Sequence, residues 1–166
     1  MITALTGFMG CGKSTVGRVL AESLGVQFLD LDEIIEKREG RSPADIIRSD
    51  GEAAFRKTEA AALKDTISRY SESSAILSLG GGAVLLPASR KLVHEKTLCI
   101  YLRATVETLE ENLQISPGDR PVLQGTSVGE LLAARAPIYE AAASVIIDID
   151  GLTTENIVDE IIISVL

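Results

Sequence analysis

Short apolar runs alternate along the chain with longer stretches in which apolar residues recur at helical spacing. The run at 97–102 (TLCIYL) is apolar throughout, which is typical of a parallel strand buried on both faces. Five runs have the length and composition of β-strands: residues 2–6, 26–31, 75–79, 97–102 and 144–149.

The segments between these runs predict helices. After the first run, Val16, Val19 and Leu20 share one face of a helix. Helical, charge-rich sequence then extends from about residue 33 to 68, with breaks near 40–43 and near Gly51. Further helices are expected over 105–113, over 128–142 and in the last segment, with Ile157, Val158, Ile161, Ile162 and Val165.

This alternation predicts an α/β fold, with one domain over residues 1–166 and a parallel sheet covered by helices on both faces. In such folds, ligands bind at the carboxyl ends of the strands. The segments 7–14, 30–32 and 80–82 each directly follow a predicted strand and hold the unusual residues of the chain. We therefore expect the functional site at this edge of the sheet.

Composition narrows the possible partners and the compartment. Twenty-four acidic against 16 basic residues give a net charge of −8, which disfavours nucleic acid and anionic membranes as partners. No apolar run approaches the ~20 residues of a membrane-spanning helix and no secretion signal is evident, so we expect a cytoplasmic protein. Cys11 and Cys99 lack metal-ligand spacing, and the single histidine, His94, is expected on a surface helix.

Residues 7–14 (GFMGCGKS) match the phosphate-binding pattern G-x-x-x-x-G-K-[ST], between a predicted strand and a predicted helix. The glycines let backbone N–H groups face phosphate oxygens, and the helix dipole favours negative charge. Lys13 is expected to reach the β- and γ-phosphates, and Ser14 to place its hydroxyl on Mg²⁺. The expected ATP-binding residues are Gly10, Cys11 through its backbone, Gly12, Lys13, Ser14 and Thr15.

A second set of polar residues is suited to a phosphoryl acceptor. The Asn-Lys-x-Asp motif of guanine-nucleotide switches is absent, because Asn112 and Asn156 are followed by Leu and Ile. Asp32 follows the second predicted strand, and Arg56 and Arg135 lie further along the chain. Two arginines can hold a carboxylate and an aspartate can accept hydrogen bonds from hydroxyls, so the set predicts a hydroxy acid as the acceptor.

Six motifs, in order and across nearly the whole chain, resemble the shikimate kinase family. They are GFMGCGKST at 7–15, DLD at 30–32, GEAAFRKTE at 51–59, LGGG at 79–82, RPVL at 120–123 and RAPIY at 135–139. The resemblance implies transfer of the γ-phosphoryl group of ATP to the 3-hydroxyl of shikimate, on the route to chorismate and the aromatic amino acids. It also implies a three-layer α/β/α kinase fold with five parallel strands, an acceptor-binding region over about 33–60, and a mobile lid over about 114–125.

The resemblance also assigns roles to individual residues. Asp32 would bind shikimate hydroxyls and is the candidate base, while Arg56 and Arg135 would hold the carboxylate. Arg120, in the lid, would contact the phosphates during catalysis, and Asp30 would support Mg²⁺ through a water. The backbone of the triple glycine would approach the substrate ring: Gly80, Gly81 and Gly82.

Two further expectations concern neighbours within the site. Glu59 follows Arg56 by one helical turn and is expected to orient it through an i, i+3 pair. Three glycines in a row remove every side chain where a ligand approaches. We expect a monomer whose partners are shikimate and ATP.

One segment departs from the family pattern. Members commonly carry an arginine about seven residues before the lid arginine, where it stacks on adenine, whereas residues 110–114 read EENLQ here. We therefore expect adenine to be held by backbone and apolar contacts. Two alternatives remain open: a related kinase that acts on gluconate or a nucleoside monophosphate, and a regulatory nucleotide-binding module without catalysis.

Overall fold

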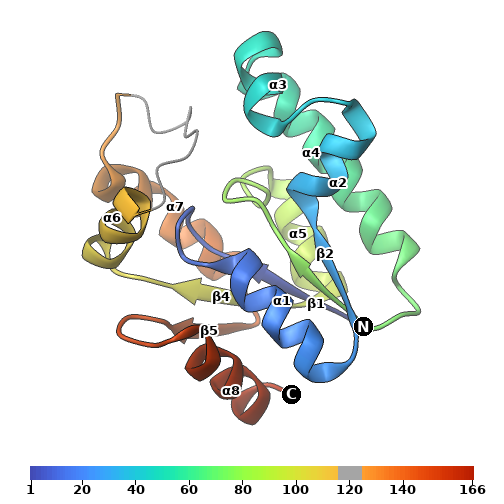
Figure 1. Ribbon diagram of the computed structural model, residues 1–166. Coiled ribbons are helices and arrows are strands. Elements are labelled where there is room, and N and C mark those ends of the chain that lie inside the picture. Colours follow the sequence, from blue (N-terminus) through green and yellow to red (C-terminus); the bar gives the residue numbers. More distant parts are fainter. Residues whose placement is uncertain (116–124) are drawn as a thin grey trace.

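A sheet of five parallel strands forms the centre of the computed structural model, which describes residues 1–115 and 125–166 (Figure 1). The strands lie in the order β2-β3-β1-β4-β5, and β1 pairs with both β3 and β4. The predicted parallel sheet is therefore confirmed. The bounds are β1 Ile2–Thr6, β2 Gln27–Asp30, β3 Ala75–Ser78, β4 Thr97–Arg103 and β5 Val145–Asp148.

Helices cover both faces of the sheet, as predicted. α1 packs beside α8 on one face, and α5 lies between α4 and α7 on the other (Figure 1). The described helices are α1 Lys13–Leu24, α2 Leu31–Glu39, α3 Pro43–Asp50, α4 Glu52–Arg69, α5 Pro87–Lys96, α6 Val106–Ile115, α7 Val128–Ala142 and α8 Thr154–Ser164. The chain thus forms the three layers of an α/β/α fold.

Local capping signals divide the region after β2 into three helices at the predicted breaks. Asp30 ends β2 and caps α2, because its Oδ1 accepts the N–H of Asp32 at 2.9 Å. Ser42 caps α3, and Pro43 occupies the first turn of that helix. Gly51, with φ 91°, separates α3 from α4. After these breaks, α3 packs against α4, and α2 packs against both.

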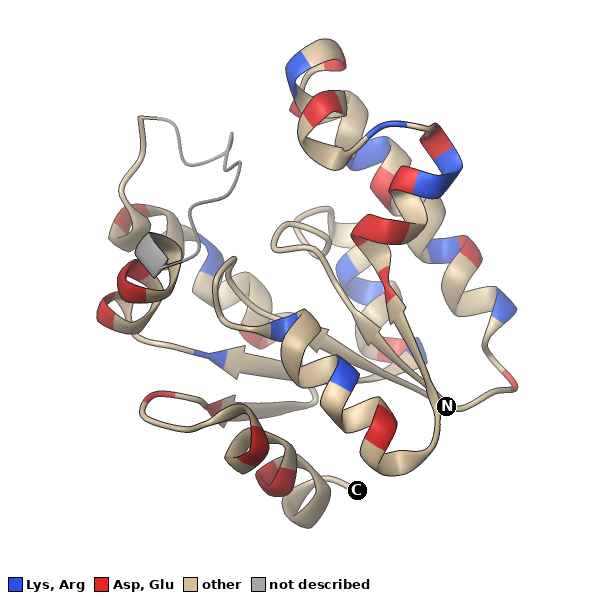
Figure 2. Cartoon of the chain, viewed as in Figure 1, with Lys and Arg blue, Asp and Glu red and all other residues tan. Residues whose placement is uncertain are grey.

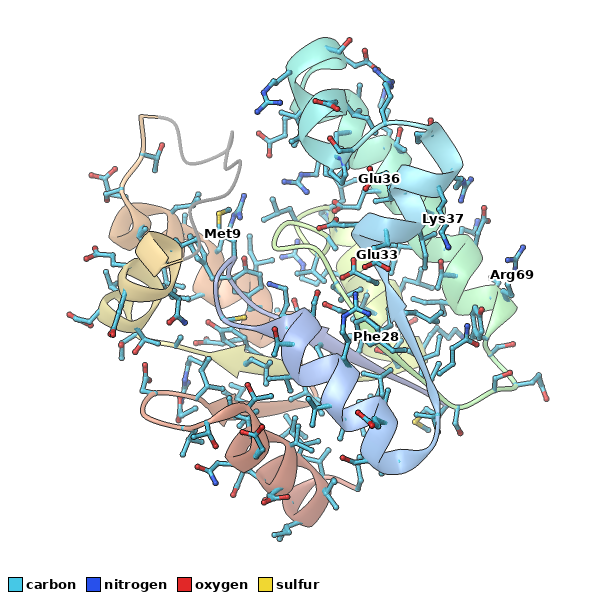
Figure 3. All side chains as sticks on the ribbon, in the orientation of Figure 1. Met9, Phe28, Glu33, Glu36, Lys37 and Arg69 are labelled. Carbon is cyan, nitrogen blue, oxygen red and sulfur yellow. The ribbon has the colours of Figure 1, made fainter. Side chains whose placement is uncertain are left out.

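Apolar and aromatic side chains fill the core, and most of the described charged side chains lie on the surface. Cys99 is fully buried in β4, and Tyr101 on the same strand packs its ring 5.2 Å from that of Tyr139 on α7. Charged residues lie mainly on the helices (Figure 2), and Lys37 and Arg69 are exposed on α2 and α4 (Figure 3). His94 is exposed on α5, as predicted. Within the described ranges, no helix is long and apolar enough to span a membrane.

Candidate active site

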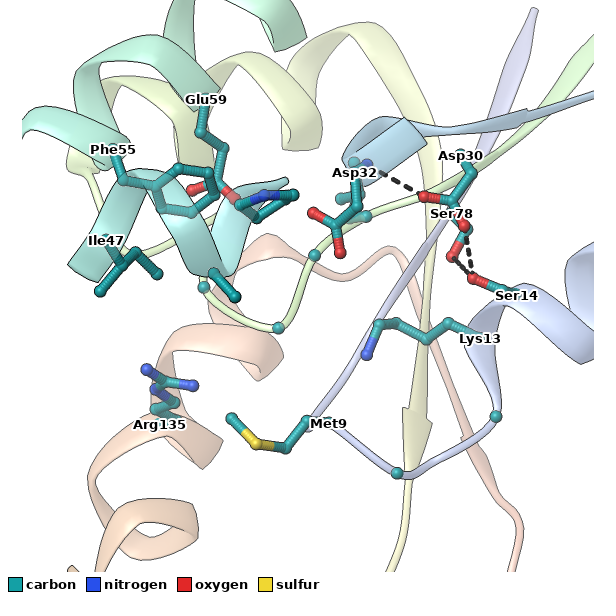
Figure 4. Close-up of a pocket in the computed structure, with 18 of the residues that line it drawn as sticks. Met9, Lys13, Ser14, Asp30, Asp32, Ile47, Phe55, Glu59, Ser78 and Arg135 are labelled. Carbon is teal, nitrogen blue, oxygen red and sulfur yellow. Dashed lines mark hydrogen bonds between the residues drawn. The ribbon is translucent and has the colours of Figure 1, made fainter. Parts of the chain in front are cut away.

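A cavity of about 530 Å³ opens where β1, β2 and β3 end (Figure 4). It is lined by the predicted site residues that the structure describes, apart from Cys11, whose side chain is buried. Arg120 and residues 116–124 of the predicted lid lie outside the described residues. The sequence did not point to several other lining residues: Met9, Pro43, Ala44, Ile47, Ser78, Leu79 and Asn112.

The loop between β1 and α1 presents free backbone donors to this cavity. Gly10 and Gly12 have φ of 85° and 88°, which glycine adopts without steric cost. The N–H of Cys11 donates to the Phe8 carbonyl at 3.2 Å and closes a tight turn. Among the described residues no side chain caps α1, and its first turn holds no acidic residue, so its first N–H groups are open to an anion.

The ammonium group of Lys13 is hydrogen-bonded to the backbone of the same loop. Its Nζ donates to the carbonyl oxygens of Gly7, at 2.8 Å, and Phe8, at 3.0 Å. These two bonds hold the cation over the loop and inside the cavity (Figure 4). A phosphate group can take the place of the two neutral carbonyls, because a charged acceptor binds ammonium more strongly.

A hydroxyl and a carboxylate meet beside the loop. Ser14 Oγ donates to Asp30 Oδ2 at 2.7 Å, and it lies 3.1 Å from Ser78 Oγ at the end of β3 (Figure 4). Asp30 therefore uses one oxygen to cap α2 and the other to contact Ser14. Hydroxyl and carboxylate oxygens are the donors that Mg²⁺ prefers, so the pair fits the predicted metal role.

Asp32 lies in the first turn of α2, on the wall of the cavity opposite Lys13 (Figure 4). Burial raises the pKa of its carboxyl above the ordinary value, and the nearby charge of Asp30 adds to the shift. Lys13 and Arg56 act in the opposite direction. A carboxylate with a raised pKa is a better proton acceptor, which agrees with the role expected of Asp32.

Arg56 is held in place by acidic neighbours on its own helix. It is 9% exposed, and its Nη1 donates to Glu59 Oε1 at 2.8 Å, which confirms the expected i, i+3 pair. Glu52 accepts a second, longer bond from Nη2 at 3.2 Å. Glu59 is only 2% exposed, and burial raises its pKa despite the opposing effect of Arg56. The guanidinium is thus fixed before any ligand binds.

The triple glycine after β3 makes room for the side chains of the site itself. A Cβ on Gly82 would overlap the guanidinium of Arg56. A Cβ on Gly80 would lie 3.0 Å from Asp32 Oδ1 and 3.2 Å from Glu59 Oε2. The glycines line the cavity, as predicted, but two of them are also needed because charged groups pack directly against the backbone.

Arg135 places a buried cation, with one unsatisfied nitrogen, at the other end of the cavity. It is 5% exposed, and its Nη1 has no hydrogen-bond partner among the described residues. One turn later, Tyr139 donates its hydroxyl to the Gly81 carbonyl at 2.5 Å and ties α7 to the glycine loop. A buried guanidinium nitrogen without a partner is costly, so this arrangement favours binding of an anionic ligand group.

These features define the class of the protein. A phosphate loop that leads into an uncapped helix shares one cavity with a candidate metal pair, Ser14 and Asp30, and a second anion pocket at Arg135. In Figure 4, Asp32 and Lys13 lie between these two ends. Such a site binds a nucleotide phosphate chain and a small anionic acceptor side by side, which is the arrangement of a phosphate-loop kinase.

Comparison with known proteins identifies the family within this class. The family model described as shikimate kinase matches residues 9–166. A shikimate kinase of Thermus thermophilus is 42% identical over 162 residues, which cover 95% of this chain and 86% of that protein. A shikimate kinase of Bordetella pertussis is 38% identical, with coverage of 95% and 75%. The chain belongs to the shikimate kinase family.

Solved structures agree with this assignment. The structure of shikimate kinase from Acinetobacter baumannii in complex with shikimate matches with a TM-score of 0.89 and 32% identity, covering 97% of this chain and 90% of that one. A gluconokinase from Sinorhizobium meliloti matches with a TM-score of 0.60 and 19% identity, covering 95% and 87%. The second likeness concerns the fold alone.

Proposed function

We propose that this protein transfers the γ-phosphoryl group of ATP to the 3-hydroxyl of shikimate and releases shikimate 3-phosphate and ADP, on the route to chorismate and the aromatic amino acids. The observation that carries this proposal is the placement of two buried arginines and Asp32 in the cavity that holds the phosphate loop. The arginines suit one carboxylate, and Asp32 suits hydroxyl groups.

The nucleotide is held by its phosphates. The open N–H groups of the loop and of the first turn of α1 bind phosphate oxygens, and Lys13 exchanges its two carbonyl partners for the β- and γ-phosphates. Thr15 lies beside them in the first turn of α1. Arg120 would contact the transferring phosphoryl group, because a planar guanidinium matches phosphate oxygens.

Ser14, through its hydroxyl, and Asp30, through a water, would hold Mg²⁺. In the described part of the chain, no group of three or more His, Cys, Asp or Glu side chains forms a metal cage. This suits an ion that keeps waters and takes substrate phosphates as its other ligands. When bound, Mg²⁺ neutralises charge on the phosphate oxygens.

The acceptor is oriented by its carboxylate. Arg135, unpaired at Nη1, and Arg56, fixed by Glu59, bind the carboxylate of shikimate. The backbone of residues 80–82 allows the ring to approach. The 3-hydroxyl then faces Asp32, which orients it and accepts its proton late in the transfer, when the hydroxyl oxygen has bonded to phosphorus.

We also propose that the protein acts as a monomer in the cytoplasm. The phosphate loop, Asp32 and both arginines line one cavity within a single chain, which supports this proposal. The net charge of −8 supports small-molecule partners over nucleic acid or membrane. Light scattering after gel filtration tests the monomer.

The proposed reaction is tested by ADP release in a coupled assay with ATP. Shikimate, gluconate or no acceptor is added, each with and without Mg²⁺. We expect ADP release that requires both shikimate and Mg²⁺. Equal ADP release without an acceptor, or release with gluconate only, would contradict the proposal.

A further inference from the structure

Helix α6 contacts the phosphate loop through two consecutive side chains. Asn112 Nδ2 donates to the Gly10 carbonyl at 2.8 Å, across 102 residues of sequence. Leu113 packs against the same glycine, since a Cβ on Gly10 would lie 3.1 Å from Leu113 Cγ. Both residues belong to the segment that lacks the usual arginine of the family. Gly10 is therefore held on two sides by a part of α6 that differs from the family pattern.

The carbonyl of Gly10 and the N–H of Cys11 belong to one peptide group. Because Gly10 has φ 85° and carries no Cβ, little steric resistance opposes rotation of this peptide group. A rotated carbonyl would direct partial negative charge toward an anion in the loop. The bond from Asn112 directs the carbonyl to α6, and the N–H of Cys11 stays bonded to Phe8.

We propose that Asn112 is a positioning residue that fixes the Gly10–Cys11 peptide of the phosphate loop before the nucleotide binds. This role rests on the proposed function, in which the loop binds the phosphates of ATP. Preorganisation of this kind removes an ordering cost from binding. It acts on the nucleotide and not on the acceptor, because Asn112 contacts the loop at Gly10 and the acceptor residues lie on α2, α4 and α7.

The main test is Asn112→Ala. We expect the Kd for ADP and the KM for ATP to rise about 2- to 12-fold, the range of one uncharged hydrogen bond. The Kd for shikimate and kcat at saturating ATP should stay within about twofold of wild type, because uniform ground-state binding alone has been lost. The matched control is Asn156→Ala, which removes the second asparagine of the chain from an exposed position on α8.

A second measurement reports on the loop without any ligand. Hydrogen exchange of the Cys11 amide, followed by NMR in the nucleotide-free protein, should be faster in Asn112→Ala than in wild type. The amides of β1 should be unchanged. Asn112→Ser serves as a second variant, because serine is polar but too short to reach the same carbonyl.

The outcomes separate this proposal from the proposed function. If the wild-type protein fails to bind ADP in calorimetry, the proposed function itself is wrong. If the wild type binds ADP and Asn112→Ala binds it equally well, with unchanged Cys11 exchange, then Asn112 has no positioning role. Equal weakening of ADP and shikimate binding would also overturn the proposal, since it would indicate a general structural role.

Discussion

At the scale of single residues, desolvation affects the proton affinity of two carboxyl groups in the cavity. The pKa values of Asp32 and Glu59 are both raised, mainly by burial. A carboxyl group with a raised folded-state pKa binds protons more readily in the folded protein than in the unfolded one. Its ionisation at neutral pH therefore lowers stability. The proposed reaction needs the ionised form of Asp32, and this form lowers the stability of the folded protein.

Replacing Asp32 should accordingly improve stability and reduce activity. We expect Asp32→Asn to raise the thermal midpoint at pH 7, because the raised pKa makes the ionised carboxylate unfavourable in the folded protein. Turnover should fall by about 100-fold or more, the scale of a lost general base. The stability gain should shrink as pH falls through the raised folded-state pKa and should vanish below the ordinary aspartate pKa of about 3.9, where Asp32 is protonated in both states.

Thermal unfolding at pH 7 and at pH 4 measures this effect. Asp159→Asn is the matched control, because it removes the same charge from an exposed position on α8. A lower midpoint for Asp32→Asn at pH 7 would show that its raised pKa does not limit stability.

The two arginines should differ when each is replaced by alanine. Both changes should weaken shikimate binding by ~2–5 kcal/mol, the cost of removing one partner from a buried charge pair. Only Arg56→Ala should also destabilise the protein strongly, because it leaves Glu59 buried without its cation. Calorimetry with shikimate and with ADP, together with urea unfolding, checks both points. Arg69→Ala, at an exposed position, is the control, and weaker ADP binding instead of shikimate binding would refute the assignment.

At the scale of elements, the triple-glycine loop after β3 contacts α4 and α7, which carry the two arginines proposed to bind the acceptor. Tyr139 of α7 donates a hydrogen bond to the carbonyl of Gly81 in this loop, and Arg56 of α4 packs on Gly82. The loop therefore sets the distance between the elements that carry the two arginines. Its glycines are needed for packing rather than for a positive φ, because none of the three has one.

A single methyl group in this loop should disturb the acceptor site. In Gly82→Ala the new Cβ displaces the Arg56 guanidinium, so shikimate binding should weaken about as much as in Arg56→Ala. ADP binding should be retained. Gly129→Ala on α7 is the control, because its Cβ would meet Val106 at an ordinary 3.9 Å. Wild-type shikimate affinity in Gly82→Ala would show that Arg56 can move without loss of function.

We expect helix α6 to affect the selection of the nucleotide donor. Leu113 packs on Gly10, and the segment around it has no arginine to stack on a purine. The loss of such a cation removes about 0.5–2 kcal/mol of attraction to the base. We therefore expect GTP to support a sizeable fraction of the ATP rate in a donor screen. Strict dependence on ATP would mean that another residue recognises adenine.

At the scale of the whole molecule, the sequence predicts features formed by residues close together in the chain. It does not predict contacts between residues far apart in the chain. The i, i+3 pair of Arg56 and Glu59 follows from helical spacing, and the phosphate loop follows from a short motif. The contacts of Ser14 with Ser78, of Tyr139 with Gly81 and of Asn112 with Gly10 span 64, 58 and 102 residues. Periodicity predicts which segments form elements, but it carries no information on which atoms meet across the sheet.

The phosphate loop and most of the residues proposed to bind the acceptor lie in separate stretches of the chain. The described residues proposed to bind the acceptor lie within residues 31–82, apart from Arg135, whereas the phosphate loop precedes that stretch. One continuous exchange, from β2 to the loop after β3, would replace most of the acceptor pocket and leave the phosphate loop intact. For evolution, this means that a lineage can acquire a new substrate through changes in one block of the gene while the phosphate loop is passed on unaltered, provided that Asp30 and Asp32 are kept within that block.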